Sequence, residues 1–307
     1  MSVVRGFLAE VRILPMSLML LMCLLGGLFA AGPLLNWSIM GLVLVNAFCF
    51  LYAAHLNDTY WDIRRGEYED GRRLHSVRFR ENGYLPRWGF GYEIPNAPIL
   101  PKGYYLAGLA LSAAIGISVM IYISTIIGWF YSALAIVGLL LALTYSAGLD
   151  KIPALGDAMW EVGVLFALFC GYYSQALKLD DSIIKIAIAL LFGLFSAKMM
   201  DSLPDTICDL HHNPPKMTFT VFLYKRGWPL SRIRHLSFIP LYICMLLFIA
   251  LTPLPIKVGA SITLIAFILD HILLRGDIEG RKTIVVAGFI LIFFMVWNII
   301  CILMRLI

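Results

Sequence analysis

The chain has 307 residues, of which 61% are hydrophobic and 14% are charged, and its mean hydropathy is +0.85. This composition excludes an ordinary soluble domain, which carries fewer apolar residues. The net charge of +5 at pH 7 does not call for a nucleic-acid partner, because the basic residues fall mostly between apolar stretches, where membrane proteins carry them.

Nine stretches of the chain are long and apolar enough to cross a membrane. A helix needs about 20 apolar residues to span the hydrocarbon core, and the lack of strand-like alternation favours helices over a β-barrel. We therefore predict an all-α, polytopic integral membrane protein, with residues 1–307 forming one bundle. The predicted spans are residues 13–32, 36–56, 103–123, 126–148, 157–177, 183–200, 236–253, 257–274 and 284–304.

The basic residues predict how the bundle is oriented. If the N-terminus lies in the cytoplasm, most of the 24 lysines and arginines fall in inner segments, as the positive-inside rule requires. The long segments 57–102 and 201–235 are then cytoplasmic, and the protein is a multi-pass protein of the cell membrane. We interpret the first apolar stretch as a retained span, because the apolar core of a cleaved signal peptide is usually only about 7–15 residues long.

Two clusters of acids end the second and the sixth predicted spans. Carboxylates beside a bilayer are costly and usually mark function, and residues four apart lie on one face of a helix. Like charges at that spacing repel, so either basic neighbours or a bound metal ion must compensate them. The clusters consist of Asn57, Asp58 and Asp62 in the first case, and of Asp201, Asp205 and Asp209 in the second.

Magnesium and a lipid diphosphate would together explain both clusters. Mg²⁺ is typically held by one or two carboxylates, with water and phosphate oxygens completing its shell, and it neutralises a leaving diphosphate. The remaining surface is apolar, which favours an isoprenoid diphosphate whose tail lies among the helices. Tyr60, Trp61 and Tyr145 flank the predicted site and could stabilise an allylic cation, although aromatic residues are also common at membrane interfaces.

At these residues the chain resembles the UbiA superfamily of intramembrane prenyltransferases, over essentially its whole length. That family has nine transmembrane helices, a first motif Asn-Asp-x-x-Asp and a second motif Asp-x-x-x-Asp. Asp201 and Asp205 match the second motif. The first motif is one residue longer here, with Asp62 four positions after Asp58, so either Asn57 or Asp58 could face the metal.

The resemblance implies an Mg²⁺-dependent prenyltransferase with a central cavity that opens to a cytoplasmic polar cap. The catalytic residues would be Asp58, Asp62, Asp201 and Asp205. The metal ligands would come from Asn57, Asp58, Asp62, Asp201, Asp205 and Asp209. The residues that bind substrate would be Lys198, Tyr145, Lys151, Arg64, Arg65 and Lys216.

The expected partners are an isoprenoid diphosphate, a small or lipid acceptor, and membrane lipids. On the family resemblance the acceptor would be an aromatic quinone precursor, such as a hydroxynaphthoate or a hydroxybenzoate. Prenyl transfer in archaeal ether-lipid synthesis (to geranylgeranylglyceryl phosphate) or in carotenoid synthesis is the nearest alternative. An ion-coupled secondary transporter is an alternative of another class, because transporters also place acids within membrane helices.

Two polar residues inside predicted spans require a separate interpretation. Asn46, in the middle of the second span, is typical of a hydrogen bond between helices. Glu161, just inside the fifth span, could be an acid of the cavity that binds the acceptor, or it could be the partner of a buried ion pair.

Overall fold

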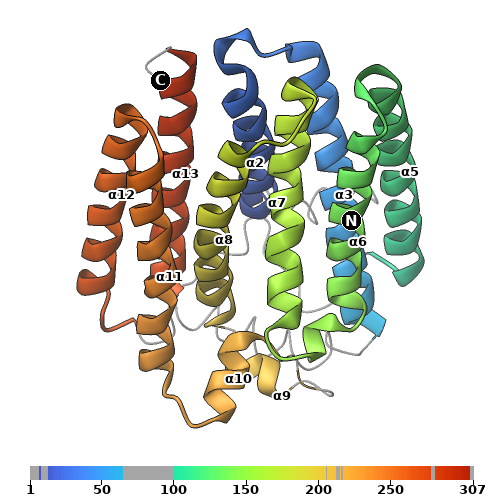
Figure 1. The fold of residues 1–307 in the computed structure, drawn as a ribbon. Helices are drawn as coiled ribbons and strands as arrows, with labels where there is room; N and C mark the ends of the chain where they lie inside the picture. The colour runs from blue at the N-terminus through green and yellow to red at the C-terminus, as the bar shows by residue number, and fades with distance from the viewer. Residues whose placement is uncertain are drawn as a thin grey trace.

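The computed structural model of the protein describes residues 7, 13–64, 100–204, 206–211, 215, 217–277 and 281–304. All the regular elements of these residues are helical, and nine helices are long and apolar enough to cross a membrane (Figure 1). The predicted all-α membrane fold is thus confirmed. The nine helices are α2 (Ile13–Ala31), α3 (Trp37–Arg64), α5 (Lys102–Ile127), α6 (Phe130–Ala147), α7 (Leu155–Ala176), α8 (Asp181–Ser202), α11 (Leu230–Leu251), α12 (Leu254–Leu273) and α13 (Arg281–Leu303).

Helix α7 occupies the middle of the bundle and packs against α2, α3, α6 and α8, while α13 packs against α2 (Figure 1). The crossing of α2 and α7 depends on two glycines. A Cβ atom on Gly26 would lie 2.1 Å from the carbonyl oxygen of Leu168, and one on Gly171 would lie 1.8 Å from that of Cys23. Small residues let membrane helices approach closely, so these two glycines allow α7 to take its central place.

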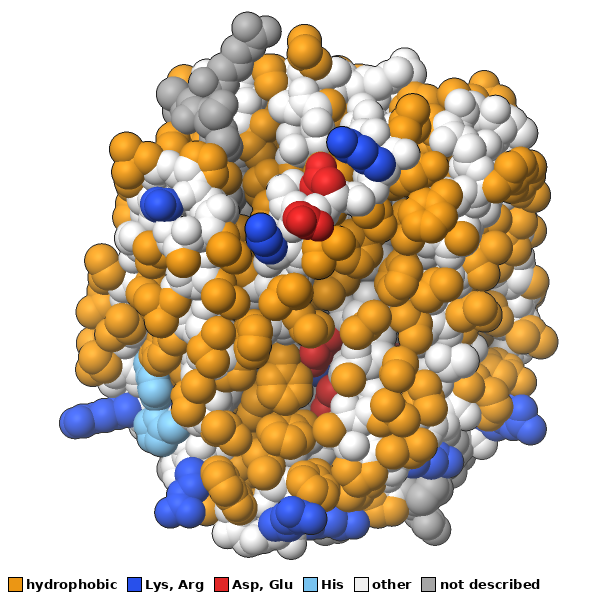
Figure 2. All heavy atoms as spheres, viewed as in Figure 1, with side chains coloured by type: hydrophobic (Ala, Val, Ile, Leu, Met, Phe, Trp, Pro, Cys, Tyr) orange, Lys and Arg blue, Asp and Glu red, His pale blue; other side chains and the backbone are white. Residues whose placement is uncertain are grey.

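The outer surface of the bundle is apolar. Figure 2 shows hydrophobic side chains over most of the visible face, with lysines and arginines towards the two ends. Large apolar side chains such as Leu111, Ile188 and Ile265 are exposed on α5, α8 and α12. Water would penalise such a surface, whereas lipid tails would not. The surface therefore fits a bilayer.

Polar bonds between helices occur where the bundle is closed to lipid. The Asn46 amide donates to the carbonyl oxygen of Gly116 at 2.8 Å, and the Tyr131 hydroxyl donates to the Asn46 amide oxygen at 2.8 Å. Asn46 of α3 therefore bonds to both α5 and α6. The predicted role of Asn46 as a bond between helices is confirmed.

Helix α3 is longer than a bilayer core and carries the first acid cluster near its C-terminal end. It has 28 residues, which corresponds to a length of about 42 Å, whereas the hydrocarbon core is about 30 Å thick. The excess length corresponds to about two turns. The last turns of α3, which carry the acids, lie at the end of the bundle where α6 and α8 also end (Figure 1).

The same end of the bundle carries two short helices, α9 (Thr206–His211) and α10 (Phe219–Lys225). They lie in the segment that we predicted as part of an inner loop. A small apolar cluster anchors α10, because Leu223 packs with Met199 of α8 and Ile233 of α11.

Helix α11 begins at Leu230, earlier than the predicted residue 236, so Arg234 is buried in a helix and not solvated in a loop. The sequence prediction failed there because Arg234 finds a polar partner, donating to the Thr283 hydroxyl at 3.2 Å.

Candidate active site

The first acid cluster is attached to α6 by two hydrogen bonds. The hydroxyl of Ser146 donates to a carboxylate oxygen of Asp58 at 2.9 Å, and the side-chain amide of Asn57 donates to the carbonyl oxygen of Leu143 at 3.0 Å. Asn57 is buried and Asp58 is half-buried. The amide nitrogen of Asn57 is bonded to the backbone of α6, and Asp58 is the one of the two residues that carries a charged oxygen.

The second acid cluster begins with an ion pair on α8. The ammonium nitrogen of Lys198 lies 3.6 Å from a carboxylate oxygen of Asp201, one turn further along the helix. Only 15% of the Lys198 side chain is exposed, compared with 65% of the Asp201 side chain. The same ammonium group lies 5.5 Å from the centre of the Tyr145 ring of α6, which is a cation–π distance.

These contacts link the two acid clusters through α6. Ser146 holds Asp58, and the preceding residue, Tyr145, lies under Lys198, which pairs with Asp201. Three helices thus bring an acid, a hydroxyl, an aromatic ring and an ammonium group into one connected set. Such a set can bind a metal-bound anion, because the acids suit a hard cation and the lysine suits phosphate oxygens.

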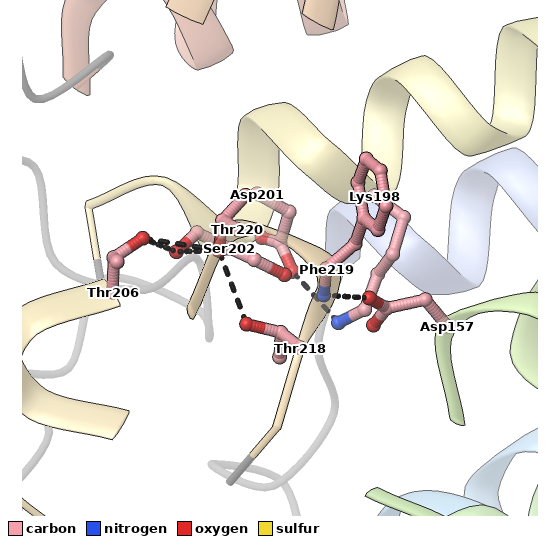
Figure 3. A network of polar contacts seen from close by, with 8 residues as sticks. All are labelled: Asp157, Lys198, Asp201, Ser202, Thr206, Thr218, Phe219 and Thr220. Atoms are coloured by element: carbon pink, nitrogen blue, oxygen red, sulfur yellow. Dashed lines mark hydrogen bonds and ion pairs between the residues drawn. The ribbon is translucent and has the colours of Figure 1, made fainter. Parts of the chain in front are cut away.

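Asp157 in the first turn of α7 ties the short helix α10 to the bundle. One of its carboxylate oxygens accepts a hydrogen bond from the backbone N–H of Phe219 at 2.7 Å. Figure 3 shows the Lys198 ammonium group pointing between the carboxylates of Asp157 and Asp201. Lys198 interacts electrostatically with both. Asp157 therefore attracts Lys198 of α8 electrostatically and accepts a hydrogen bond from Phe219 of α10.

A set of buried hydroxyl groups connects the end of α8 with α9 and α10. The Thr206 hydroxyl lies 3.0 Å from both the carbonyl oxygen of Ser202 and the hydroxyl of Thr220. The hydroxyls of Thr218 and Thr220 are 3.1 Å apart (Figure 3), and Thr218 caps α10 by accepting from the N–H of Val221. These bonds fix the chain that follows the second acid cluster against the bundle.

A second acid of α7, Glu161, lies one turn deeper than Asp157. Both are almost fully buried, with 4% of Asp157 and 3% of Glu161 exposed. Figure 2 shows acidic atoms recessed between apolar side chains, in the region between α8 and α7. Aromatic groups surround this part of α7, because the Trp160 ring lies 6.0 Å from the ring of Tyr145 and 6.2 Å from that of His55.

The structure places the other predicted residues as follows. Arg64 ends α3 and lies over the ring of Trp61, 5.0 Å from its centre. Lys151 is exposed in the short 3-10 turn η2 (Leu149–Lys151), and Asp209 is half-buried in α9. Asp62 belongs to α3 one turn after Asp58, but its side chain lies outside the described part of the chain. Three further predicted residues also lie outside the described residues: Arg65, Asp205 and Lys216.

The donor set suits a magnesium ion that a substrate helps to hold. Among the described side chains, no group of three or more His, Cys, Asp and Glu residues converges as a complete metal site. Mg²⁺ does not need such a group, because one or two carboxylates, water and phosphate oxygens satisfy it. Asp58 and Asp201, at the ends of α3 and α8, each offer a carboxylate of this kind.

Sequence reasoning missed Asp157 and Ser146. The carboxylate of Asp157 meets a backbone N–H 62 positions away, and Ser146 meets an acid 88 positions away. One sequence signal could have found Asp157. It precedes Glu161 by four residues inside an apolar span, so the two acids share one helix face.

These features define the class of the protein: a polytopic helical membrane protein with a polar site at one end of the bundle. No protein-family model and no curated protein sequence matches the chain. Two solved structures share its fold. A UbiA homolog from Aeropyrum pernix, solved in its apo form, aligns with a TM-score of 0.68 and 14% identity over 94% of this chain and 98% of that chain. A digeranylgeranylglyceryl phosphate synthase aligns with a TM-score of 0.63 and 10% identity over 98% of this chain and 99% of that chain. The resemblance inferred from the acid motifs is therefore confirmed for the fold, over nearly the whole chain.

Proposed function

We propose that the protein is an Mg²⁺-dependent prenyltransferase that moves a polyprenyl group from an isoprenoid diphosphate to an acceptor within the membrane. The observation that carries this proposal is the connected set of Asp58, Ser146, Tyr145, Lys198 and Asp201, which joins two acid clusters across three helices. The fold shared with a digeranylgeranylglyceryl phosphate synthase supports the same type of chemistry.

The residues of this set, and their neighbours in the two acid motifs, would each bind either the metal or the substrate. Asp58 and Asp201, together with Asp62 and Asp205, would hold Mg²⁺, which supplies charge neutralisation for the departing diphosphate. Lys198 would donate hydrogen bonds to the phosphate oxygens, and the face of Tyr145 would stabilise positive charge that develops on the prenyl carbon. The apolar interior between the helices would receive the isoprenoid tail.

The acceptor and the orientation belong to the same proposal. An aromatic quinone precursor, such as a hydroxybenzoate or a hydroxynaphthoate, is the acceptor that the family resemblance supports. We place the end of the bundle that carries α9 and α10 in the cytoplasm, because the segments that connect the spans at that end hold most of the lysines and arginines. A water-soluble acceptor would then reach the site from the cytoplasm, whereas the prenyl donor would reach it from the membrane.

The direct test is an assay of the purified full-length protein in lipid vesicles. Radiolabelled geranylgeranyl diphosphate is supplied with hydroxybenzoate, hydroxynaphthoate or geranylgeranylglyceryl phosphate, in the presence of Mg²⁺ or of EDTA. We expect a prenylated product that disappears with EDTA. If no acceptor is prenylated and an ion-driven uptake is measured in the same vesicles, the protein is a transporter and the proposal is wrong.

A pair of variants on one helix provides the control. Asp201→Asn should reduce turnover at least about 100-fold, because it removes a charged oxygen that the bound metal needs. Asp181 stands in the first turn of the same helix α8, at the opposite end of the bundle. Asp181→Asn should therefore retain the wild-type rate, and equal losses in the two variants would contradict the assignment.

A further inference from the structure

Two acids of α7 are not among the residues assigned above to Mg²⁺ or to the diphosphate. Asp157 and Glu161 lie on the same face of α7, one turn apart, and both are more than nine-tenths buried. One oxygen of each carboxyl group has no hydrogen-bond partner among the described residues. A buried polar atom without a partner is costly, so these two oxygens indicate a ligand that donates hydrogen bonds.

The charges around these two acids disfavour a ligand group that brings a negative charge without a cation of its own, unlike a diphosphate that carries bound Mg²⁺. Asp157 and Glu161 both interact with the ammonium group of Lys198, which Asp201 also engages. One cation therefore faces three acids, and a further negative charge beside Glu161 would be repelled. The aromatic rings of Trp160 and Tyr145 lie next to this part of α7 and give an acceptor an apolar surface on which to pack.

We propose that Asp157 and Glu161 form the acceptor subsite, and that it selects a hydroxyl group whose neighbouring atoms carry no negative charge. This inference rests on the proposed prenyl transfer and specifies its acceptor. A phenol or an alcohol donates its hydroxyl hydrogen to Glu161, while Asp157 orients it and keeps α10 over the site. The inference thereby narrows the acceptors of the proposed function: a hydroxybenzoate or hydroxynaphthoate with its carboxylate directly beside the hydroxyl does not fit, whereas one with the carboxylate across the ring does.

The subsite also accounts for the proton that the reaction releases. The C1–O bond of the prenyl diphosphate breaks and its electron pair leaves with diphosphate. If the acceptor is an alcohol, its hydroxyl oxygen bonds to C1 and its proton passes to the Glu161 carboxylate, which gives a prenyl ether and diphosphate. If the acceptor is a phenol, the hydroxyl proton passes to Glu161 while the neighbouring ring carbon bonds to C1, and the resulting dienone moves the hydrogen of that carbon to its oxygen, which gives a ring-prenylated phenol and diphosphate. In both cases the protonated Glu161 later returns its proton to solvent.

Chemical labelling tests the subsite without any prenyl donor. Dicyclohexylcarbodiimide modifies carboxyl groups in apolar surroundings when they take up a proton, as Glu161 does in the proposed step, and mass spectrometry locates the product. We expect the label on Glu161 of the full-length protein. We also expect 1-naphthol to slow that labelling at a concentration at least about tenfold lower than 1-hydroxy-2-naphthoate needs, since the two compounds differ only in the carboxylate beside the hydroxyl.

Asp270 of α12 provides an internal control. It is also buried, and its carboxylate oxygens have no hydrogen-bond partner among the described residues, but it does not belong to the α7 subsite. Its labelling should be the same with and without 1-naphthol. If Glu161 takes no label, if both compounds protect it equally, or if 1-naphthol protects Asp270 equally well, the inference is overturned.

The activity of Glu161→Gln separates this inference from the proposed function. The variant should transfer a prenyl group to 1-naphthol about 100-fold more slowly than the wild type, because it lacks the base, while its Kd for geranylgeranyl diphosphate does not rise. Equal rates in variant and wild type would contradict the role of Glu161. If the wild type transfers no prenyl group to any acceptor although 1-naphthol protects Glu161, the proposed function fails and the subsite stands.

Discussion

The backbone N–H of Phe219 donates a 2.7 Å hydrogen bond to the carboxylate of Asp157, which joins α10 to the first turn of α7. The bond matters because α10 follows the second acid cluster, and the bond holds α10 against the end of the bundle where that cluster lies. A hydrogen bond to a charged group contributes about 1.5–3 kcal/mol. Leu223 adds apolar contacts and Thr220 adds hydroxyl contacts to Thr206, so the bond to Asp157 is the charged member of the set of contacts that holds α10.

Asp157→Ala should detach α10 without unfolding the bundle. The variant removes the acceptor of the Phe219 N–H, so the amide hydrogens of α10 should exchange about tenfold to 100-fold faster than in the wild type. Hydrogen exchange read by mass spectrometry measures this in detergent or lipid. Asp157→Asn retains an acceptor oxygen and should exchange at a rate closer to the wild type. Equal protection in all three proteins would show that the apolar and hydroxyl contacts hold α10 without Asp157.

Lys198→Met should weaken the binding of prenyl diphosphate. Methionine keeps the length and the apolar part of the side chain but loses the ammonium group, so the Kd for geranylgeranyl diphosphate should rise about tenfold to 100-fold. Lys185 lies on the same helix, nearer its other end, and is exposed. Calorimetric titration of Lys185→Met should give the wild-type Kd, and a similar loss in both lysine variants would indicate a non-specific effect of charge.

Ser146→Ala should lower turnover through Asp58. The variant removes the 2.9 Å hydrogen bond that orients the carboxylate, so kcat should fall about tenfold at saturating substrate. Thr144, on the same helix, is exposed and donates to backbone oxygens of its own helix. Thr144→Val should therefore keep the wild-type kcat. An unchanged kcat in Ser146→Ala would mean that Asp58 needs no support from α6.

Acid should destabilise the opposite end of the bundle at Asp180, the N-cap of α8. The hydroxyls of Ser182 and Tyr172 donate to its carboxylate and lower the pKa of Asp180 to about 2, whereas an unfolded aspartate titrates near 3.9. The stabilisation is therefore complete above about pH 4 and is lost as the pH falls towards 2. Asp180→Asn cannot titrate, so its unfolding temperature should change less than that of the wild type between pH 5 and pH 2.5. Asp181→Asn is the control and should keep the wild-type dependence.

The parts of the structure that could be predicted from the sequence are those that depend on local composition. The length of the apolar stretches predicted the spans, and the acids at the ends of two spans predicted where the polar site lies. The contacts inside the site could not be predicted, because Asp58 with Ser146, and Asp157 with Phe219, meet only after distant helices pack. The early start of α11 was missed for a similar reason, since the partners of the buried Arg234, among them the Thr283 hydroxyl of α13 and the carbonyl oxygen of His271, are distant in sequence.

The close approach of α2 and α7 gives a prediction about stability, not about chemistry. A Cβ atom on Gly171 would lie 1.8 Å from the carbonyl oxygen of Cys23, which is backbone and cannot move aside. Gly171→Ala must therefore push α2 away from α7, at a cost of about 1–3 kcal/mol or more. Gly41 on α3 makes a matched control, because a Cβ atom there meets nothing within 4 Å, and alanine is the better helix former by about 1 kcal/mol. Thermal unfolding in detergent should thus be earlier for Gly171→Ala and equal or later for Gly41→Ala. An unchanged unfolding temperature in Gly171→Ala would mean that α2 can move away from α7 at no cost, and α7 would then not be held in the centre of the bundle by this crossing.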